Sequence, residues 1–339
     1  MKHSFNVLKA DPELYQGASN AVSTCLRIRP EEKVTLITDA ATQDIAASMF
    51  DEVQKVGARC NAYMLEDFSP RPHTSMPQEI LDDLATSQVS IYAVYGQIGE
   101  LRTRMQMTKV VTENRIRHAH MININRQIMT EGMRADFNKV DDISRKVWEL
   151  ARSAKHIRAT TKLGTDIQAE FSPQLKWLKT SGIISPEKWG NLPGGEVFTA
   201  PLNVNGTFIV DGVVGDYLCA KYGDLEPQPL TIEVRDNRMK EAYSPNKELE
   251  KEFWAYCHTD ENSERVGEFA IGTNIQLKHV IGHILQDEKI PGVHIAFGHP
   301  YAEHTGANWT SSTHIDVVGT KFDIWIDDKK IMEEGEFLI

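Results

Sequence analysis

The sequence predicts a protein of the α/β class, with an N-terminal doubly wound α/β domain at residues 1–157 and a C-terminal β-rich α+β domain at residues 158–339. Three observations predict this. Strand-like and helix-like segments alternate in the first half, which is typical of a parallel sheet covered by helices. Short β-rich runs separated by Gly, Asn and Asp dominate after about residue 157. A chain of 339 residues also suits two domains better than one.

In the N-terminal half, residues 1–30 suggest a leading helix, and β-rich runs follow at 34–39, 61–65, 90–95 and 120–125. The first run leads into a helix with Ile45, Met49, Val53 and Val56 on one apolar stripe, which Gly57 should end. Neither the Gly-x-Gly-x-x-Gly fingerprint nor a phosphate-binding Gly-x-x-x-x-Gly-Lys motif is present. We therefore expect a Rossmann-like shape without dinucleotide chemistry.

Another helix should start at Asp142, and the C-terminal half then reads as strands and turns. Its clearest strands are 206–210, 230–234 and 322–326, and Asp327-Asp328 suggests a hairpin turn. A helix is expected near 276–285, where His279 and His283 have the i, i+4 spacing of a zinc helix. Val280 stands where such a motif needs glutamate, so an ordinary amphipathic helix is the better interpretation.

Composition excludes several functions. A net charge of −11 argues against a nucleic-acid partner and against binding to anionic membranes. No apolar stretch has the length needed to cross a bilayer, and the N-terminus lacks a signal-peptide core, so we expect a cytoplasmic protein. Four widely spaced cysteines without a Cys-x-x-Cys pair are interpreted as reduced thiols (Cys25, Cys60, Cys219, Cys257).

Chemistry is concentrated in five residues of the C-terminal half, each inside or beside a short apolar run: Glu196, Glu268, His294, His314 and Asp316. A charge in such surroundings needs compensation, and a divalent cation supplies it. Carboxylates and imidazoles suit a hydrolytic two-metal centre better than a structural zinc site, which prefers thiolates. In a strand, His314 and Asp316 would point to the same face and could hold one ion.

Each of these residues also has a simpler interpretation. His314 and Asp316 could be solvated residues of an edge strand, and His294 a hydrogen-bonded core histidine. Glu196 and Glu268 could lie on the surface. Tyr301 follows His294 by seven residues, and its hydroxyl could stabilise an oxyanion near a metal. His299 and His304 lie in the same loop and could bind substrate or metal, although solvated loop residues are the simpler interpretation.

Four blocks carry a family resemblance, and they are 191–201, 265–274, 294–298 and 314–316. They resemble the thermophilic metalloaminopeptidase family of the aminopeptidase T and aminopeptidase S type across roughly residues 160–339. The resemblance implies two zinc or cobalt ions held by Glu196, Glu268, His294, His314 and Asp316, with Tyr301 beside them. It also implies a homodimer with enclosed catalytic clefts.

We therefore predict a metal-dependent aminopeptidase that hydrolyses the N-terminal residue of peptides. A two-metal-activated water would attack, Tyr301 would stabilise the oxyanion, and Glu196 or Glu268 would accept a proton. The alternative is a mononuclear Fe(II) ring-cleaving dioxygenase, of the dihydroxypyridine type, or another small-molecule metalloenzyme of the same fold. His294, His314 and Asp316 could form its facial triad, although Ala270 stands where that branch has a histidine. A non-catalytic binding protein is the third possibility.

Overall fold

The computed structural model describes residues 10–215 and 217–339, which divide into two compact units. Unit 1 comprises Met1–Asn138 and Gly182–Gly194, and unit 2 comprises Lys139–Ser181 and Gly195–Ile339. This division differs from the predicted boundary at residue 157. Helix α6 (Phe137–Ala151) falls mostly in unit 2 because its apolar residues Val147 and Ala151 join the core of that unit. Gly182–Gly194 returns to unit 1 because strand β8 (Gly190–Asn191) pairs there with β4 (Arg117–Ile122).

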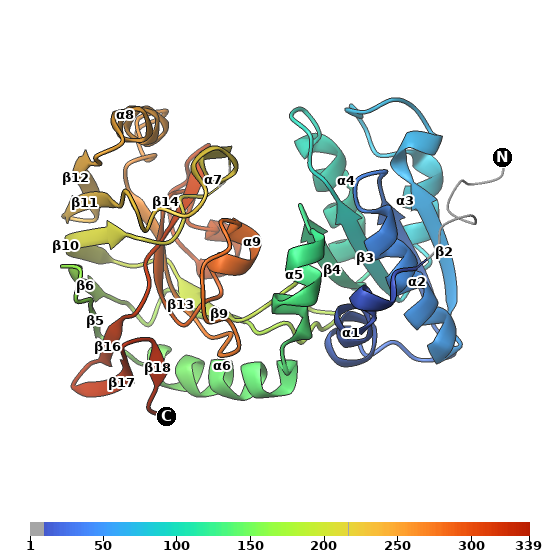
Figure 1. Cartoon of the computed structure of the whole chain (residues 1–339), viewed down its shortest axis with the longest axis horizontal. Coiled ribbons are helices and arrows are strands. Elements are labelled where there is room, and N and C mark those ends of the chain that lie inside the picture. The colour runs from blue at the N-terminus through green and yellow to red at the C-terminus, as the bar shows by residue number, and fades with distance from the viewer. Residues whose placement is uncertain (1–9, 216) are drawn as a thin grey trace. The chain divides into compact units, whose positions relative to one another are not determined.

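Unit 1 is a doubly wound α/β fold, as predicted. Its sheet is parallel, with strand order β2-β1-β3-β4-β8. The remaining strands are β1 (Lys33–Thr38), β2 (Arg59–Met64) and β3 (Val89–Val94), and the predicted runs overlap them and β4. The chain steps from β1 to β2 on one side, then crosses to β3 on the other, so the winding reverses between β1 and β3 (Figure 1).

Helices cover both faces of this sheet. Ile37 of β1 packs with apolar residues of α3 (Gln78–Leu84) and α4 (Leu101–Glu113). Helix α2 (Gln43–Val56) contacts β1, β2 and α1 (Tyr15–Ser19), and α1 contacts α5 (Arg126–Thr130). Gly57 ends α2 with φ of 86°, as its position predicts. The predicted leading helix is broken into Pro12–Leu14, α1 and Asn20–Cys25, and residues 1–9 lie outside the described residues.

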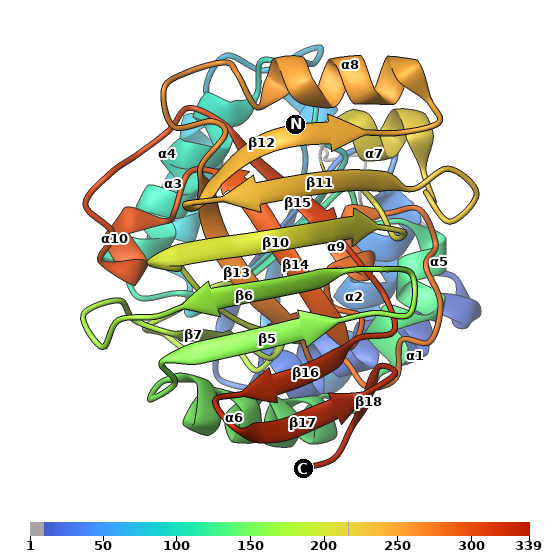
Figure 2. The same ribbon diagram turned by 90° about the vertical axis from the view of Figure 1, so that its left-hand side faces the viewer.

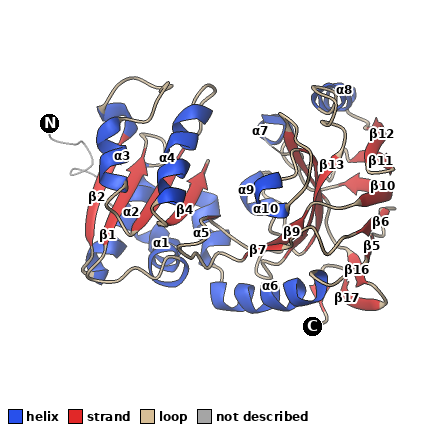
Figure 3. Ribbon diagram, turned by 180° about the vertical axis from the view of Figure 1, so that it is seen from behind, coloured by secondary structure: helices blue, strands red, loops and turns tan. Residues whose placement is uncertain are grey.

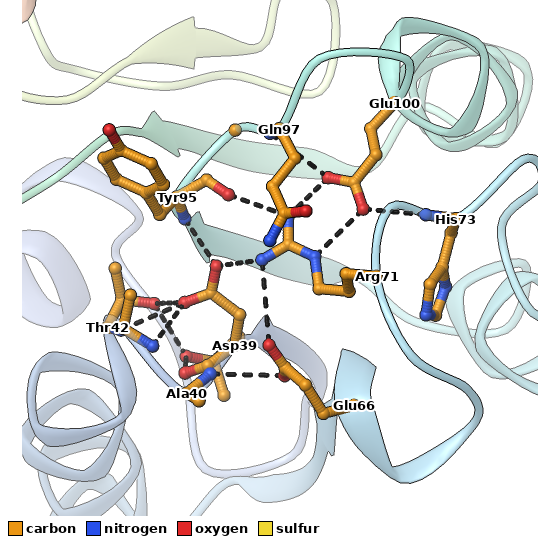
Figure 4. A network of polar contacts seen from close by, with 12 residues as sticks. Asp39, Ala40, Thr42, Glu66, Arg71, His73, Tyr95, Gln97 and Glu100 are labelled. Carbon is orange, nitrogen blue, oxygen red and sulfur yellow. Dashed lines mark hydrogen bonds and ion pairs between the residues drawn. The ribbon is translucent and has the colours of Figure 1, made fainter.

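Buried ion pairs fill the carboxyl edge of the sheet where the winding reverses, a place at which α/β proteins commonly bind ligands. Arg71 bridges the carboxylates of Asp39 and Glu100, and all three side chains are buried (Figure 4). Asp39 also accepts hydrogen bonds from the backbone N–H groups of Tyr95 (2.8 Å) and Thr42 (3.0 Å). The network ties the ends of β1 and β3 together.

Unit 2 contains two antiparallel sheets, seen face-on in Figure 2. The eight-stranded sheet has the order β12-β11-β10-β6-β5-β16-β17-β18, and the five-stranded sheet has the order β15-β14-β13-β9-β7. The strands of the first are β5 (His156–Thr160), β6 (Asp166–Glu170), β10 (Asn203–Val210), β11 (Leu230–Arg235), β12 (Arg238–Tyr243), β16 (Asp323–Ile326), β17 (Lys329–Glu333) and β18 (Glu336–Phe337). Those of the second are β7 (Leu178–Thr180), β9 (Glu196–Thr199), β13 (Val266–Gly272), β14 (Gly292–Gly298) and β15 (His314–Val318).

One apolar core joins the two sheets. Phe208 and Ile324 of the large sheet belong to the same buried cluster as Phe269, Ile295 and Val317 of the small one. Helix α8 (Lys247–Tyr256) adds Leu249 and Phe253 to this core, and short helices α7 (Tyr217–Tyr222), α9 (Ile284–Asp287) and α10 (Ala302–Thr305) complete the unit (Figure 3). The small sheet is therefore held firmly on one face.

The prediction of a helix near 276–285 is wrong. Only Ile284–Asp287 is helical, and the preceding residues form turns. Gly282 has φ of 76°, which α-helical backbone does not allow. The carboxylate of Asp287 accepts the N–H groups of Ile281 and His283, so it replaces the helical hydrogen bonds of this segment.

The four cysteines are free thiols, which agrees with their predicted state. Within the described ranges, no helix combines the length and the apolar character that a membrane span requires.

Candidate metal centre

The candidate residues lie on one face of the five-stranded sheet. Residues paired across antiparallel strands point to the same face, and successive residues of a strand alternate. Along the pairings, Glu196 lies opposite Gly272, His294 opposite Ala270, and His314 opposite Gly298. Ala296 lies between Glu268 on one neighbouring strand and Asp316 on the other. The alternation therefore brings all five predicted side chains to the same face.

The opposite face of the same strands is apolar. Val197, Phe269, Ile271, Ile295 and Val317 alternate with the polar residues and belong to the core between the two sheets. The short apolar runs in the sequence are therefore strands with one face in the core and one at the centre. Small residues separate the polar side chains on the second face and leave room between them (Ala270, Gly272, Ala296).

The ligand atoms are closely spaced. Atoms of Glu196, Glu268 and His294 lie within 4.8 Å of one another, and all three residues are buried. His294 Nε2 lies 3.3 Å from Glu268 Oε1, and His314 Nε2 lies 3.5 Å from Asp316 Oδ1. Two ligand atoms bound at about 2.0–2.2 Å to a tetrahedral ion lie about 3.3–3.6 Å apart. The donor set and its spacing therefore fit a divalent ion.

The tautomer of His314 supports this fit. Its Nδ1 lies 2.9 Å from the backbone carbonyl oxygen of His299, and because a carbonyl only accepts, Nδ1 carries the proton. The Nε2 atom of a neutral ring is then free to bind a cation, and it is this atom that faces Asp316. Metal-binding histidines commonly donate their second nitrogen to a carbonyl in this way.

A β-bulge directs the side chain of Glu268. The register of β13 against β14 shifts between Val266 and Glu268, so Gly267 is the extra residue. A Cβ atom at position 267 would lie 2.3 Å from the carbonyl oxygen of Gly298, which only glycine avoids. The Val-Gly-Glu sequence therefore encodes the local shift that sets the face on which Glu268 lies.

The carboxylates of the centre shift the pKa values of its histidines so that these rings favour their positively charged form. Burial raises the pKa of Glu268, and Asp316 adds to this effect. Burial opposes charge on His294 and His314, but the neighbouring carboxylates outweigh it and raise their pKa values to about 9 and about 10. Despite burial, His314 lowers the pKa of Asp316 to about 2. A divalent cation would meet the same electrostatic demand.

Tyr301 lies beside these residues. Its ring centroid is 4.8 Å from that of His314 and 6.2 Å from that of Phe198, whose strand position is on the face of the centre. Tyr301 as a whole is 36% exposed, but burial of its hydroxyl, together with Glu268 and Asp316, raises the pKa of that hydroxyl well above the usual value. The hydroxyl therefore keeps its proton and can donate a hydrogen bond.

Comparison with known sequences assigns the chain to a family. A sequence model of the thermophilic metalloprotease (M29) family matches residues 135–337, which is more than half of the chain. The chain belongs to this family. Its general activity is therefore that of a metallopeptidase, a metal-dependent hydrolase, as predicted. A comparison with curated proteins gives no match.

Two solved structures share the fold of this M29 metalloprotease. Wild-type AmpT from Thermus thermophilus is 16% identical, with a TM-score of 0.70 over 96% of this chain and 99% of the other. A 2,5-dihydroxypyridine dioxygenase from Pseudomonas putida KT2440 is 14% identical, with a TM-score of 0.71 over 96% of each chain. At these identities the likeness establishes the fold only.

The metalloprotease centre contains two charged residues that the sequence reasoning missed. Lys289 is buried and Glu288 is partly buried, and Lys289 Nζ lies 2.7 Å from Glu196 Oε2 and 2.5 Å from Glu288 Oε1. Burial raises the pKa of Glu288 to about 8, and Glu196 and Asp316 contribute to the increase. In the sequence, Asp287-Glu288-Lys289 reads as the solvated end of a helix, and only the apolar run that begins at Ile290 hinted at burial.

The two loop histidines differ in their relation to the centre. His299 contributes its backbone carbonyl to His314, and its Nδ1 accepts the N–H of Tyr301 at 3.0 Å. His304 is exposed and lies 3.8 Å from its neighbour Glu303. The first therefore helps to order the loop, whereas the second fits the predicted solvated position.

Proposed function

We propose that this metallopeptidase is an aminopeptidase that removes the N-terminal residue of peptides at the face formed by β9, β13, β14 and β15. The observation that carries the proposal is the gathering of Glu268, His294, His314 and Asp316 on one sheet face, with ligand atoms at spacings that fit a divalent ion. Glu196 lies on the same face, and its carboxylate is 3.6 Å from His294 Nε2.

A divalent ion bound here would polarise the scissile carbonyl and lower the pKa of a bound water. The protein side chains would supply the remaining functions. Glu268 is buried with a raised pKa, which suits a group that takes up a proton from the attacking water. Tyr301 keeps its proton and would donate a hydrogen bond to the oxyanion that develops on the substrate.

The finer expectations belong to the same proposal. They are zinc or cobalt as the metal, a pair of ions held by five side chains, a peptide substrate, a homodimer and a cytoplasmic location. The number of ions depends on whether Glu196 is free to act as a ligand. Without Glu196, only Glu268, His294, His314 and Asp316 are left, and four side chains hold a pair of ions less readily than five.

The proposal is tested with a set of aminoacyl anilides and with matched peptides whose N-terminus is free or acetylated. Protein purified without oxygen and loaded with zinc or cobalt should release the first residue of free peptides and leave acetylated ones intact. Equal cleavage of both peptides, or cleavage at internal bonds only, would remove the aminopeptidase assignment while leaving a metallopeptidase.

A second candidate rests on the same side chains. His294, His314 and Asp316 together form the two-histidine, one-carboxylate set of non-haem Fe(II) oxygenases, and the chain shares its fold with a dioxygenase. Ala270 lies directly opposite His294, so this position adds no imidazole to the centre. Oxygen consumption by the iron-loaded protein with a dihydroxypyridine, without release of amino acids from peptides, would favour this candidate.

A further inference from the structure

The backbone of His314 faces the outer edge of the five-stranded sheet. Strand β15 is the last strand on that side, and the backbone groups of successive residues point alternately toward β14 and away from it. The carbonyl of Thr313 accepts the N–H of His299 at 2.6 Å, so the N–H and the carbonyl of His314 point the other way. A residue on an outer edge needs partners from elsewhere in the chain.

The segment 212–215 supplies such partners farther along the same edge. The N–H of Val318 donates to the carbonyl of Val213 at 2.9 Å, and the N–H of Gly215 donates to the carbonyl of Asp316 at 2.7 Å. At His314 the partner is a side chain instead. The edge is therefore closed by backbone at two positions and by one tyrosine at the third.

That partner is the hydroxyl of Tyr256, the last residue of α8. The hydroxyl donates to the carbonyl of His314 at 3.2 Å and accepts the N–H of His314 in a longer contact of 3.4 Å. A hydroxyl can do both at once, because it has one proton and two lone pairs. It therefore imitates the pair of hydrogen bonds that a neighbouring antiparallel strand would supply.

The packing of α8 directs Tyr256 to this point. Residues three apart lie on the same side of a helix, and Phe253 precedes Tyr256 by three residues. Phe253 is buried, and its ring centroid lies 6.0 Å from that of Phe297 on β14, the residue that pairs with Ile315 of β15. Tyr217 of α7 packs against the ring of Tyr256, with the centroids 5.9 Å apart. The hydroxyl is therefore carried by a helix that the core holds in place.

We propose that Tyr256 is a positioning residue for the metal ligand His314. Its hydroxyl fixes the backbone of His314 at the sheet edge, while the carbonyl of His299 fixes the ring through Nδ1. Together they direct Nε2 toward the metal centre before an ion binds. The inference rests on the metal centre of the proposed function, and it adds a residue that acts through a ligand and forms no bond to the metal itself.

The test is a comparison of zinc affinities. Metal-free protein is titrated with Zn²⁺ in competition with a coloured chelator. Tyr256→Phe keeps the ring and removes the hydroxyl, and it should weaken binding about 10–100-fold, the usual cost of losing a group that orients a ligand. Tyr222→Phe, which removes a hydroxyl bonded to Glu252 of the same helix at 3.0 Å, is the matched control and should bind zinc as the wild type does.

A second background separates positioning from a general effect on the fold. If Tyr256 acts through His314, Tyr256→Phe should leave the zinc affinity of His314→Ala unchanged, because the imidazole that it positions is already gone. An equal loss in both backgrounds would assign the hydroxyl a structural role only and would overturn the inference. A Tyr256→Phe protein that binds zinc as tightly as the wild type would overturn it too.

If Tyr256→Phe does not fold, hydrogen exchange in the wild-type protein decides the matter. With isotope-labelled histidine, nuclear magnetic resonance can follow the N–H of His314 in the metal-free protein. That N–H should exchange more slowly than in an unfolded chain, because the hydroxyl of Tyr256 holds it. Exchange at the rate of an unprotected amide would contradict the inference.

The outcomes also separate this inference from the proposed function. Zinc binding that depends on Tyr256 through His314, without release of N-terminal residues, would keep the inference and remove the aminopeptidase proposal. Release of N-terminal residues, with a zinc affinity that Tyr256→Phe does not change, would have the opposite result. A wild-type protein that binds no zinc would contradict both.

Discussion

The proton positions of single side chains decide what the centre can do. The backbone carbonyl of His299 holds the proton of His314 on Nδ1 and leaves Nε2 for a ligand role. Burial and neighbouring carboxylates keep the hydroxyl of Tyr301 protonated. Each of the two side chains can be replaced by itself, so the two roles can be tested one residue at a time.

Tyr301→Phe removes the proposed oxyanion donor and keeps the ring against His314. Turnover should fall by about 10²–10³, the usual cost of losing one such donor, while bound metal stays unchanged. Steady-state kinetics on an aminoacyl anilide, with elemental analysis of the same sample, measure both. Tyr243→Phe, at an exposed tyrosine bonded to Glu241, is the control. Unchanged turnover in Tyr301→Phe would remove this role.

His314→Ala deletes a proposed ligand together with its link to the carbonyl of His299. Even loss of a group that only orients a ligand costs about 10–100-fold in metal affinity, so the variant should lose at least that much. Calorimetric titration with Zn²⁺ measures the change. His304→Ala serves as the control, because that exposed histidine lies in the neighbouring loop. Equal affinities for the two variants would contradict the ligand role.

The geometry of the five-stranded sheet brings residues that are far apart in the sequence to one site. In the five-stranded sheet the strand order β15-β14-β13-β9-β7 runs opposite to the chain order, and the strands' alternation faces one set of side chains toward the core and the other toward the centre. The bulge at Gly267 shifts the register of β13, so that Glu268 pairs with Ala296 of β14. Ala296 in turn pairs with Asp316 of β15, so one strand separates Glu268 from Asp316. The centre therefore depends on backbone features as much as on its ligands.

Gly267→Ala should disturb both the fold and the centre. The new methyl group would meet the carbonyl of Gly298, and overpacking of this kind costs about 1–3 kcal/mol of unfolding free energy. Metal affinity should fall as well, because the bulge positions Glu268. Chemical denaturation and zinc titration measure the two effects. Gly190→Ala, where the nearest atom would be 3.9 Å away, should change stability by less than about 0.5 kcal/mol.

The stability of the whole protein reflects buried titratable groups in each unit. In unit 1, His118 and His120 lie two residues apart in β4, with the ring of His120 stacked on Tyr92 and that of Trp189 nearby. Burial lowers the pKa of both histidines, that of His120 to about 3. In unit 2, the buried Lys289 lies against the carboxylates of Glu196 and Glu288 at the metal centre.

Unit 1 should lose stability in acid. Because the folded pKa of His120 lies below the unfolded value near 6.5, its contribution is complete above pH 6.5 and is lost as pH falls toward 3. Each such histidine adds a slope of up to about 1.4 kcal/mol per pH unit. Denaturation followed by the fluorescence of Trp189 between pH 4 and 8 measures this, and His120→Gln should flatten the slope. Identical slopes would contradict the assignment.

Unit 2 should gain stability from bound metal. An ion that binds only the folded state at 100 times its dissociation constant stabilises it by about 2.7 kcal/mol. Calorimetry should therefore show a higher unfolding temperature for the zinc-loaded protein than after treatment with a chelator. In a His314→Ala and Asp316→Ala double variant this difference should largely disappear. The same unfolding temperature with and without metal would argue against an ion at this centre.

Much of this arrangement could be predicted from sequence because it depends on local patterns. The runs around Leu36, Ile91 and Phe208 have the composition of strands, and Gly57 ends its helix as glycine usually does. The segment 276–283 resisted prediction because one carboxylate, that of Asp287, captures backbone N–H groups that a helix would use. Such a competing partner leaves little trace in apolar periodicity.

By itself, the sequence determined which residues alternate along each strand. It therefore determined that Glu268, His294, His314 and Asp316 point away from the face on which their apolar neighbours enter the core. Only the tertiary structure decided that these strands adjoin, and that Lys289 is enclosed beside Glu196 rather than solvated. The physical reason is that side-chain alternation is a property of a few consecutive residues. Strand pairing and the burial of a charge depend instead on partners far away in the chain.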